Sequence, residues 1–196
     1  MSFRTSLFIF FGLLLIGLGS YFTVHNGWYP VAIIDFKFVS ASTLEKDYQA
    51  AAHYFTNALL TYGANKTNQN VLKEESTKQE IRRSALEKIV IDAIIFKEAQ
   101  KEFGDNLDVR VENLISKNVQ LNNLAEAADT LYGMTLEEFK ERIVVTQARR
   151  ELLEERKLTE KTDFKEWLKG VSQNSKVIIL VPYLKWNGSG IEITSS

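Results

Sequence analysis

The chain of 196 residues contains no cysteine, and this absence removes several kinds of chemistry at once. The protein forms no disulfide, has no thiolate nucleophile, builds no thiolate zinc site and offers no cysteine for lipid attachment. Histidine is almost as scarce, because only His25 and His53 are present. Neither has a second histidine or a carboxylate at the spacing of metal ligands, so the sequence predicts no metal site.

An excess of charge of either sign is also missing. The 24 lysines and arginines nearly balance the 25 aspartates and glutamates, which leaves a formal net charge of −1. Proteins that bind nucleic acid normally carry a basic excess, so we expect no nucleic-acid partner. The glycines are scattered and no serine lies in a G-x-S-x-G context, so no phosphate loop or serine nucleophile is indicated. We predict no cofactor and no catalytic residue.

The longest apolar segment lies at the N-terminus, where residues 6–24 read SLFIFFGLLLIGLGSYFTV without a charge. As a helix this segment would span about 28 Å, close to the ~30 Å hydrocarbon core of a bilayer. Arg4 precedes the segment, and Trp28 and Tyr29 follow it where interfacial aromatic residues tend to lie. We predict a single-pass anchor in the cytoplasmic membrane, with residues 1–5 in the cytoplasm and the rest of the chain extracytoplasmic.

This segment has two other interpretations. A cleaved signal peptide would need small residues at its −3 and −1 positions, and the sequence offers Leu18 and Ser20 there. A buried core helix is the second alternative, but the segment lies at the terminus behind a basic residue. With either an anchor or a signal peptide, the bulk of the chain is exported.

After a linker at residues 25–30, two segments have the composition of strands. Val31–Ser40 reads VAIIDFKFVS, and the run from Val177 to Tyr183 is rich in β-branched residues. Pro182 lacks a ladder donor, which favours an edge position or the end of a strand. Because a lone strand leaves its backbone groups unpaired, we predict that the two segments pair and bring the ends of the exported domain together.

Apolar residues at helical spacing fill the chain between these strands and predict a mainly α domain. The segment from about 80 to 103 is apolar over so wide an arc that we expect it at the centre of the domain. Capping-box pairs Ser42/Glu45 and Thr135/Glu138 predict two helix starts. The expected helices are about 42–62, 80–103, 108–121, 124–132, 135–158 and 163–170, within a domain at 31–186 and before a flexible tail at 187–196.

The order of these elements resembles the N-terminal chaperone domain of SurA-type periplasmic chaperones and of the related PrsA- and PpiD-type foldases. The most specific segments are LEKIVIDAIIFKEAQKEFG (86–104) and LYGMTLEEFKERIVVTQARRELLEER (131–156), and the likeness extends over roughly Val31–Lys185. The chain has Asp35-Phe36 where family members usually have Asn-Gly. The resemblance implies an all-helical peptide-binding domain, closed by a small two-stranded pairing of its ends.

In that family a parvulin-type isomerase domain commonly follows the long helix, whereas here only four residues separate Leu158 from the last helix. The resemblance therefore implies a non-enzymatic protein that holds unfolded or nascent exported polypeptides in an apolar cradle of helices. We predict that Phe103, Leu107, Tyr132, Met134 and Phe139 line the groove, because they lie near helix ends where packing should be least complete. The alternatives are a cell-envelope adaptor that holds one dedicated partner and an isomerase with a degenerate site.

Overall fold

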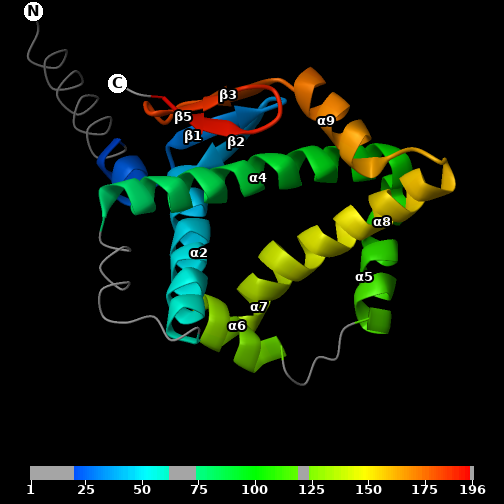
Figure 1. Cartoon of the computed structure of the whole chain (residues 1–196), viewed down its shortest axis with the longest axis horizontal. Coiled ribbons are helices and arrows are strands. Elements are labelled where there is room, and N and C mark those ends of the chain that lie inside the picture. The colour runs from blue at the N-terminus through cyan, green and yellow to red at the C-terminus, as the bar shows by residue number, and fades with distance from the viewer. Residues whose placement is uncertain (1–19, 62–73, 119–123, 195–196) are drawn as a thin grey trace, which may run out of the picture.

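The structure, a computed structural model, describes residues 20–61, 74–118 and 124–194. It is mainly helical and contains two small antiparallel sheets, as the sequence predicts (Figure 1). Both sheets lie on one side of the long helix α4 (Glu75–Phe103), and helices α2 and α8 pack against its other sides. Most of the expected anchor lies outside the described residues, within which no helix is long and apolar enough to cross a membrane.

The segment expected to be one strand is a hairpin of β1 (Pro30–Ile34) and β2 (Lys37–Ser40). Ile34 pairs with Lys37, so the connection contains two residues. Asp35 and Phe36 have φ values of 46° and 71°, the left-handed conformation that a type I′ turn requires at both positions. The prediction of one strand over 31–40 is therefore wrong, because the chain reverses at Asp35-Phe36.

Asp35 ties this turn to two distant parts of the chain. Its carboxylate accepts hydrogen bonds from Lys97 Nζ at 2.8 Å and from the backbone N–H of Lys176 at 3.1 Å. Its own N–H donates to the carbonyl of Lys176. Burial alone would raise the pKa of Asp35, but these hydrogen bonds and the two positive charges lower it. The turn is thereby fixed against α4 and the start of the closing strand.

The predicted pairing of the two ends of the domain is confirmed. Strand β3 (Val177–Ile179) lies antiparallel to β1, with Ile33 opposite Ile178, and the sheet order is β2-β1-β3. The sheet has three strands instead of two because β2 occupies the other edge of β1. Pro182 lies beyond the end of β3, in the turn that leads to β4 (Leu184–Trp186).

The segment expected to be a flexible tail is part of the fold instead. Strand β5 (Ile191–Ile193) pairs with β4, and Ile191 is only 3% exposed. Glu87 Oε2 accepts from the Ile191 N–H, and Arg83 donates to the Ile191 carbonyl, both at 2.9 Å. The prediction of a flexible tail is therefore wrong for this hairpin. Its backbone is held by Arg83 and Glu87 of α4, which are about a hundred residues away in the sequence, so no local pattern indicates the contact.

The remaining helices follow the predicted order. Their bounds are α2 (Ala41–Thr61), α5 (Leu107–Asn118), α6 (Leu124–Tyr132), α7 (Leu136–Phe139), α8 (Val145–Thr159) and α9 (Phe164–Asn174). A short 3₁₀ turn, η2 (Gly104–Asn106), precedes α5, and a π-helical turn, η4 (Lys140–Val144), joins α7 to α8. The helix predicted over 135–158 is therefore interrupted by a π turn.

Local capping explains several of these boundaries. The capping box of Thr135 and Glu138 and the Asp163 cap are present. At α2 the capping hydroxyl belongs to Ser40, which accepts from the Thr43 N–H at 3.2 Å, so the expected Ser42 cap is wrong by two residues. Helix α9 also continues past Gly170 to Asn174, because it packs against α4 and α8.

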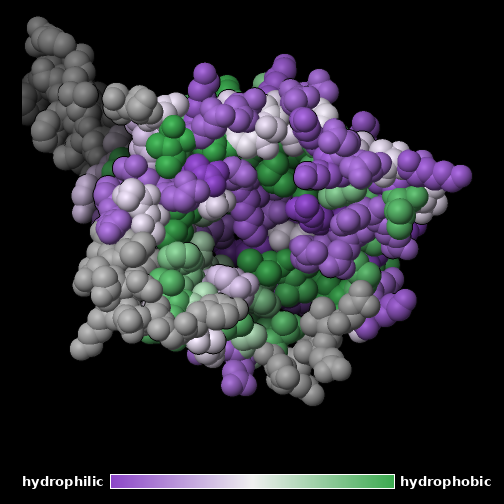
Figure 2. Space-filling view, in the orientation of Figure 1, coloured by the Kyte–Doolittle hydropathy of each residue, from purple (hydrophilic) through white to green (hydrophobic). Residues whose placement is uncertain are grey.

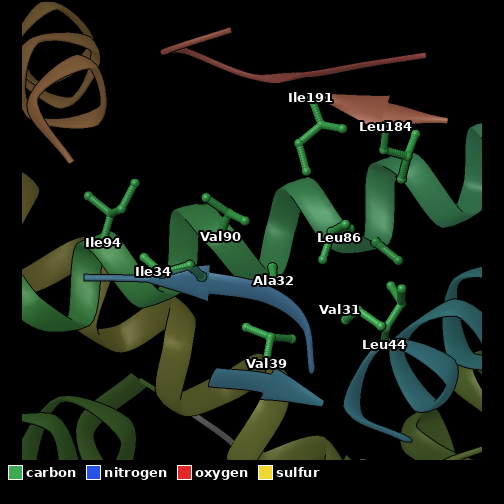
Figure 3. Packing of buried hydrophobic residues seen from close by; sticks show 11 residues of the cluster. Val31, Ala32, Ile34, Val39, Leu44, Leu86, Val90, Ile94, Leu184 and Ile191 are labelled. Atoms are coloured by element: carbon green, nitrogen blue, oxygen red, sulfur yellow. The ribbon is translucent and has the colours of Figure 1, made fainter. Parts of the chain in front are cut away.

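The central position predicted for α4 is confirmed by its burial on two sides. Leu86, Val90 and Ile94 are fully buried against the sheets, where they meet Ala32 and Ile34 (Figure 3). Ile95 and Ala99 are equally buried on another side, where they meet residues of α5 and α8. A third, smaller cluster joins α2, α6 and α7.

We predict that Ile191→Ala lowers the free energy of unfolding by about 2 to 5 kcal/mol, because it leaves a cavity in the core around α4. Ile193→Ala is the matched control two residues away, on a side chain that is 42% exposed, and should cost less than about 1 kcal/mol. Denaturant titrations of both variants measure the difference. Equal losses would show that the C-terminal hairpin contributes no core residue.

We predict that Phe36→Gly raises the free energy of unfolding by about 1 kcal/mol, because glycine adopts the left-handed conformation without the steric cost of a side chain. Phe38→Gly, at an extended position of β2, should instead lower it by about 1 kcal/mol. The same titrations report both values. A loss of stability in Phe36→Gly would contradict the I′ assignment.

Candidate peptide-binding cleft

An apolar cleft of about 600 Å³ lies between α2, α4, the end of α6 and the π turn η4. This volume is within the range of pockets that hold small ligands or side chains. Figure 2 shows the molecule hollowed between α2, α4 and the α7–α8 helix, with apolar and hydrophilic residues side by side. The apolar lining residues are Ala50, Ala51, Tyr54, Phe55, Ile81, Ala85, Tyr132, Met134 and Ile143.

Aromatic rings form one wall of the cleft. Tyr54 on α2 stacks on Tyr132 of α6, with ring centroids 5.1 Å apart and an angle of 19° between the planes. Tyr132 in turn contacts Phe139, at 5.2 Å between centroids. Burial, followed by the neighbouring Tyr54, raises the pKa of Tyr132. Tyr54 and Phe55 remain substantially exposed, so this wall presents aromatic surface to whatever enters the cleft.

Met134 is held in the cleft by the caps on either side of it. Gly133, at φ +62°, ends α6, and the N–H of Met134 donates to the carbonyl of Ala128 across this turn. Thr135 then begins α7 as its N-cap. Met134 is 7% exposed and lies on the lining of the cleft. A thioether adapts its shape to irregular apolar partners, which suits a surface that binds varied side chains.

Helix α2 is clamped to the end of α6 by two polar side chains. Asn57 Nδ2 donates to the carbonyl of Thr130 at 2.6 Å, and His53 Nδ1 lies 3.2 Å from the carbonyl of Leu131. These contacts satisfy carbonyl groups that a helix leaves unpaired at its C-terminus. A side chain on Gly133 would meet the His53 ring at 3.2 Å, so glycine permits the close approach. His53 therefore has a structural role at this contact.

Charged groups form another part of the cleft lining, where Asp47 and Lys88 lie. Asp47 of α2 forms an ion pair with Arg142 of the π turn at 2.6 Å, and the two side chains are 11% and 20% exposed. Lys88 of α4 donates to Asp92 at 2.6 Å and to the carbonyl of Arg142 at 3.2 Å. Burial raises the pKa of Asp92, and the charge and hydrogen bond of Lys88 oppose this effect. The cleft thus has an apolar wall and a charged wall.

The π turn places residues of both walls. Turns of this kind arise where an extra residue enters a helix and are frequent at functional sites. Thr146 Oγ1 donates to the carbonyls of Arg142 and Ile143, at 2.8 and 3.0 Å, so side chains satisfy backbone groups at the irregularity. Arg142 then reaches Asp47, and Ile143 lines the cleft. Without the extra residue of the π turn, the helix would be rotated at this point, and Arg142 and Ile143 would not both face the cleft region.

The five residues predicted to line a groove fall into two groups. Tyr132, Met134 and Phe139 belong to one cluster, in which the first two line the cleft and Phe139 supports Tyr132 from behind. Phe103 and Leu107 belong to a different cluster with α5 and α8, where Leu107 is 1% exposed and contributes to the core. The prediction omitted Tyr54, Ile81 and Ile143. These residues line the cleft only because α2, α4 and the π turn, which are distant in the sequence, lie together in the fold.

Within the described residues, no group of His, Asp or Glu side chains is placed to hold a metal ion. No protein-family model, curated protein or solved structure matches the chain. The chemical character of the cleft therefore rests on its own residues, which offer apolar surface, aromatic rings and a few charges at one side.

We predict a coupling free energy of about 1 to 3 kcal/mol between Asp47 and Arg142 in a double-mutant cycle with alanine, because their charged hydrogen bond is largely shielded from water. The control is the cycle for Lys46 and Glu138, which joins α2 to α7 and whose side chains are 56% and 37% exposed. That cycle should give less than about 1 kcal/mol. Equal couplings would mean that the charged wall is not shielded.

Proposed function

We propose that this protein is a membrane-anchored, extracytoplasmic, chaperone-like protein that holds unfolded or nascent exported polypeptides in the cleft. The cleft is the observation that carries this proposal. Its apolar wall buries side chains without requiring a particular polar partner, which favours weak and broad recognition. The exposed Tyr54 and Phe55 offer rigid aromatic contacts of the kind that dominate binding energies.

The order of elements agrees with this proposal. The β1–β3 pairing closes a chain of helices whose pattern resembles the SurA-type peptide-binding domain. The isomerase domain that commonly follows the long helix in that family has no counterpart between α8 and α9, which four residues separate. We accordingly propose no isomerase activity. The apolar run at residues 6–24 is the proposed anchor.

The adaptor alternative rests on the charged wall. Asp47, Glu80 and Lys88 lie on the lining and could orient one dedicated partner instead of many clients. The two functions differ in selectivity. A holding protein delays aggregation of several unrelated unfolded clients, whereas an adaptor binds one folded partner and leaves those clients to aggregate.

We predict that the double variant Tyr54→Ser/Phe55→Ser holds unfolded clients about tenfold more weakly, which corresponds to about 1.4 kcal/mol of lost apolar contact. The assay follows light scattering of a chemically unfolded client mixed with the full chain in lipid nanodiscs. The control is Val109→Ser/Leu158→Ser, which removes two exposed apolar side chains from α5 and α8, outside the cleft.

Full suppression of aggregation by the cleft variant would contradict the proposal, as would equal losses in the two variants. Suppression of no client by the unsubstituted chain would favour the adaptor. A proline-isomerisation assay with the same preparation should show no rate above background, and a clear acceleration would overturn the non-enzymatic part.

A further inference from the structure

The outer face of the β2-β1-β3 sheet is apolar where a half-buried sheet is normally polar. Phe38 and Ile178 both lie directly opposite Ile33, so these three side chains form a row on one face. The opposite face carries Ala32, which packs on α4. Phe38 is 73% exposed and Ile178 is 54% exposed. No described element covers this row.

The row extends to both ends of the sheet. Phe36, at the tip of the hairpin, is 81% exposed, and Leu180, just beyond β3, is 46% exposed. We name these five residues the outer sheet face: Ile33, Phe36, Phe38, Ile178 and Leu180. Phe36 is the most informative member, because an aromatic residue in the left-handed conformation costs stability and packs against no core.

One lysine lies beside the exposed aromatic ring at the tip of this face. The neighbouring Lys37 instead lies over the Phe96 ring of α4, on the opposite face of the sheet. Lys176 Nζ lies 5.8 Å from the centre of the Phe36 ring. Lysines beside exposed aromatic rings suit the headgroup region of an anionic bilayer.

The opposite end of the face adjoins the segment that follows the apolar run. Leu180 lines a hollow together with Val24, which ends that run, and Tyr29, and the intervening Trp28 is exposed. The described segment from Val24 to β1 therefore enters the sheet at the Leu180 end, while Lys176 lies at the Phe36 end. Both ends of the outer sheet face thus have features that favour a lipid surface.

We propose that the outer sheet face lies on the membrane surface, with Phe36 and Phe38 among the headgroups and Lys176 on anionic lipid. This inference rests on the anchor in the proposed function and adds the orientation of the domain to it. The free backbone edges of β2 and β3 limit the depth of insertion, because unpaired N–H and C=O groups are costly in hydrocarbon. The contact is therefore interfacial.

The orientation of the cleft follows from this contact. The sheets cover the side of α4 that carries Leu86 and Val90, whereas Ile81, Ser84 and Lys88 line the cleft on another side of the same helix. In Figure 1 the sheets and the α2–α6–α7 region lie on opposite sides of α4. A bilayer at the outer sheet face consequently leaves the cleft open to the compartment in which exported chains emerge.

Depth-dependent fluorescence quenching tests the proposal, and the absence of native cysteine makes single labels straightforward. The full chain is reconstituted into vesicles of zwitterionic and anionic phospholipid, with an environment-sensitive fluorophore on Phe38→Cys or Ile178→Cys. Val109→Cys, on an exposed position of α5, is the control. We expect spin-labelled lipids to quench the sheet probes at least threefold more strongly than the control probe.

Each other outcome overturns the inference. Equal quenching at all three positions in a chain that floats with the vesicles removes the membrane contact and leaves the anchor intact. A concentration-dependent blue shift of the sheet probes without lipid identifies a second copy of the chain as the occupant. Failure to float removes both the anchor and the contact.

Discussion

Burial of α4 on more than one side is the constraint on which the rest of the structure depends. A helix that is apolar around most of its circumference is stable only when other elements cover it on several sides. Here β1 and β3, from the two ends of the described chain, meet over Leu86, Val90 and Ile94. Helices α5 and α8 cover Ile95 and Ala99. The closing strand is therefore a structural requirement of α4.

The cleft occupies the part of α4 that this covering does not complete. Near Ile81 and Lys88, α2 and the π turn approach α4 without closing over it. Tyr54 and Tyr132 stack on each other in its lining, and the Asp47–Arg142 ion pair joins α2 to the π turn. Apolar surface that remains accessible in this way has a stabilising partner only when a ligand binds, which is the physical basis of the proposed holding function.

The sequence predicts most of the helical framework because periodicity and capping are local. The stripe of α4, its end at Gly104 and the Thr135/Glu138 box follow from spacing alone. Three features depend on distant partners and were not predicted. The hairpin at Asp35 is fixed by Lys97 and Lys176, and the docking of Ile191 by Arg83 and Glu87. The π turn at Lys140–Val144 is supported by Lys88 and Thr146.

The same distinction separates the groove residues that sequence could identify from those it could not. Tyr132 and Met134 lie beside a glycine at a helix end, so their incomplete packing is visible in the sequence. Leu107 lies near Gly104 at the start of α5, yet residues of α4 and α8 bury it. Whether a residue near a helix end is covered depends on the neighbouring helix, and single-sequence periodicity does not specify that neighbour.

The most direct test of the account is methyl NMR of the full chain with labelled methionine. The chain contains only two methionines, Met1 and Met134, so the spectrum holds at most two methionine methyl resonances, and that of Met134 reports the cleft. We predict that the Met134 signal shifts in a saturable way as an unfolded client is added, and that Met134→Leu identifies the resonance. An unchanged Met134 signal at client concentrations that suppress aggregation would contradict binding in the cleft.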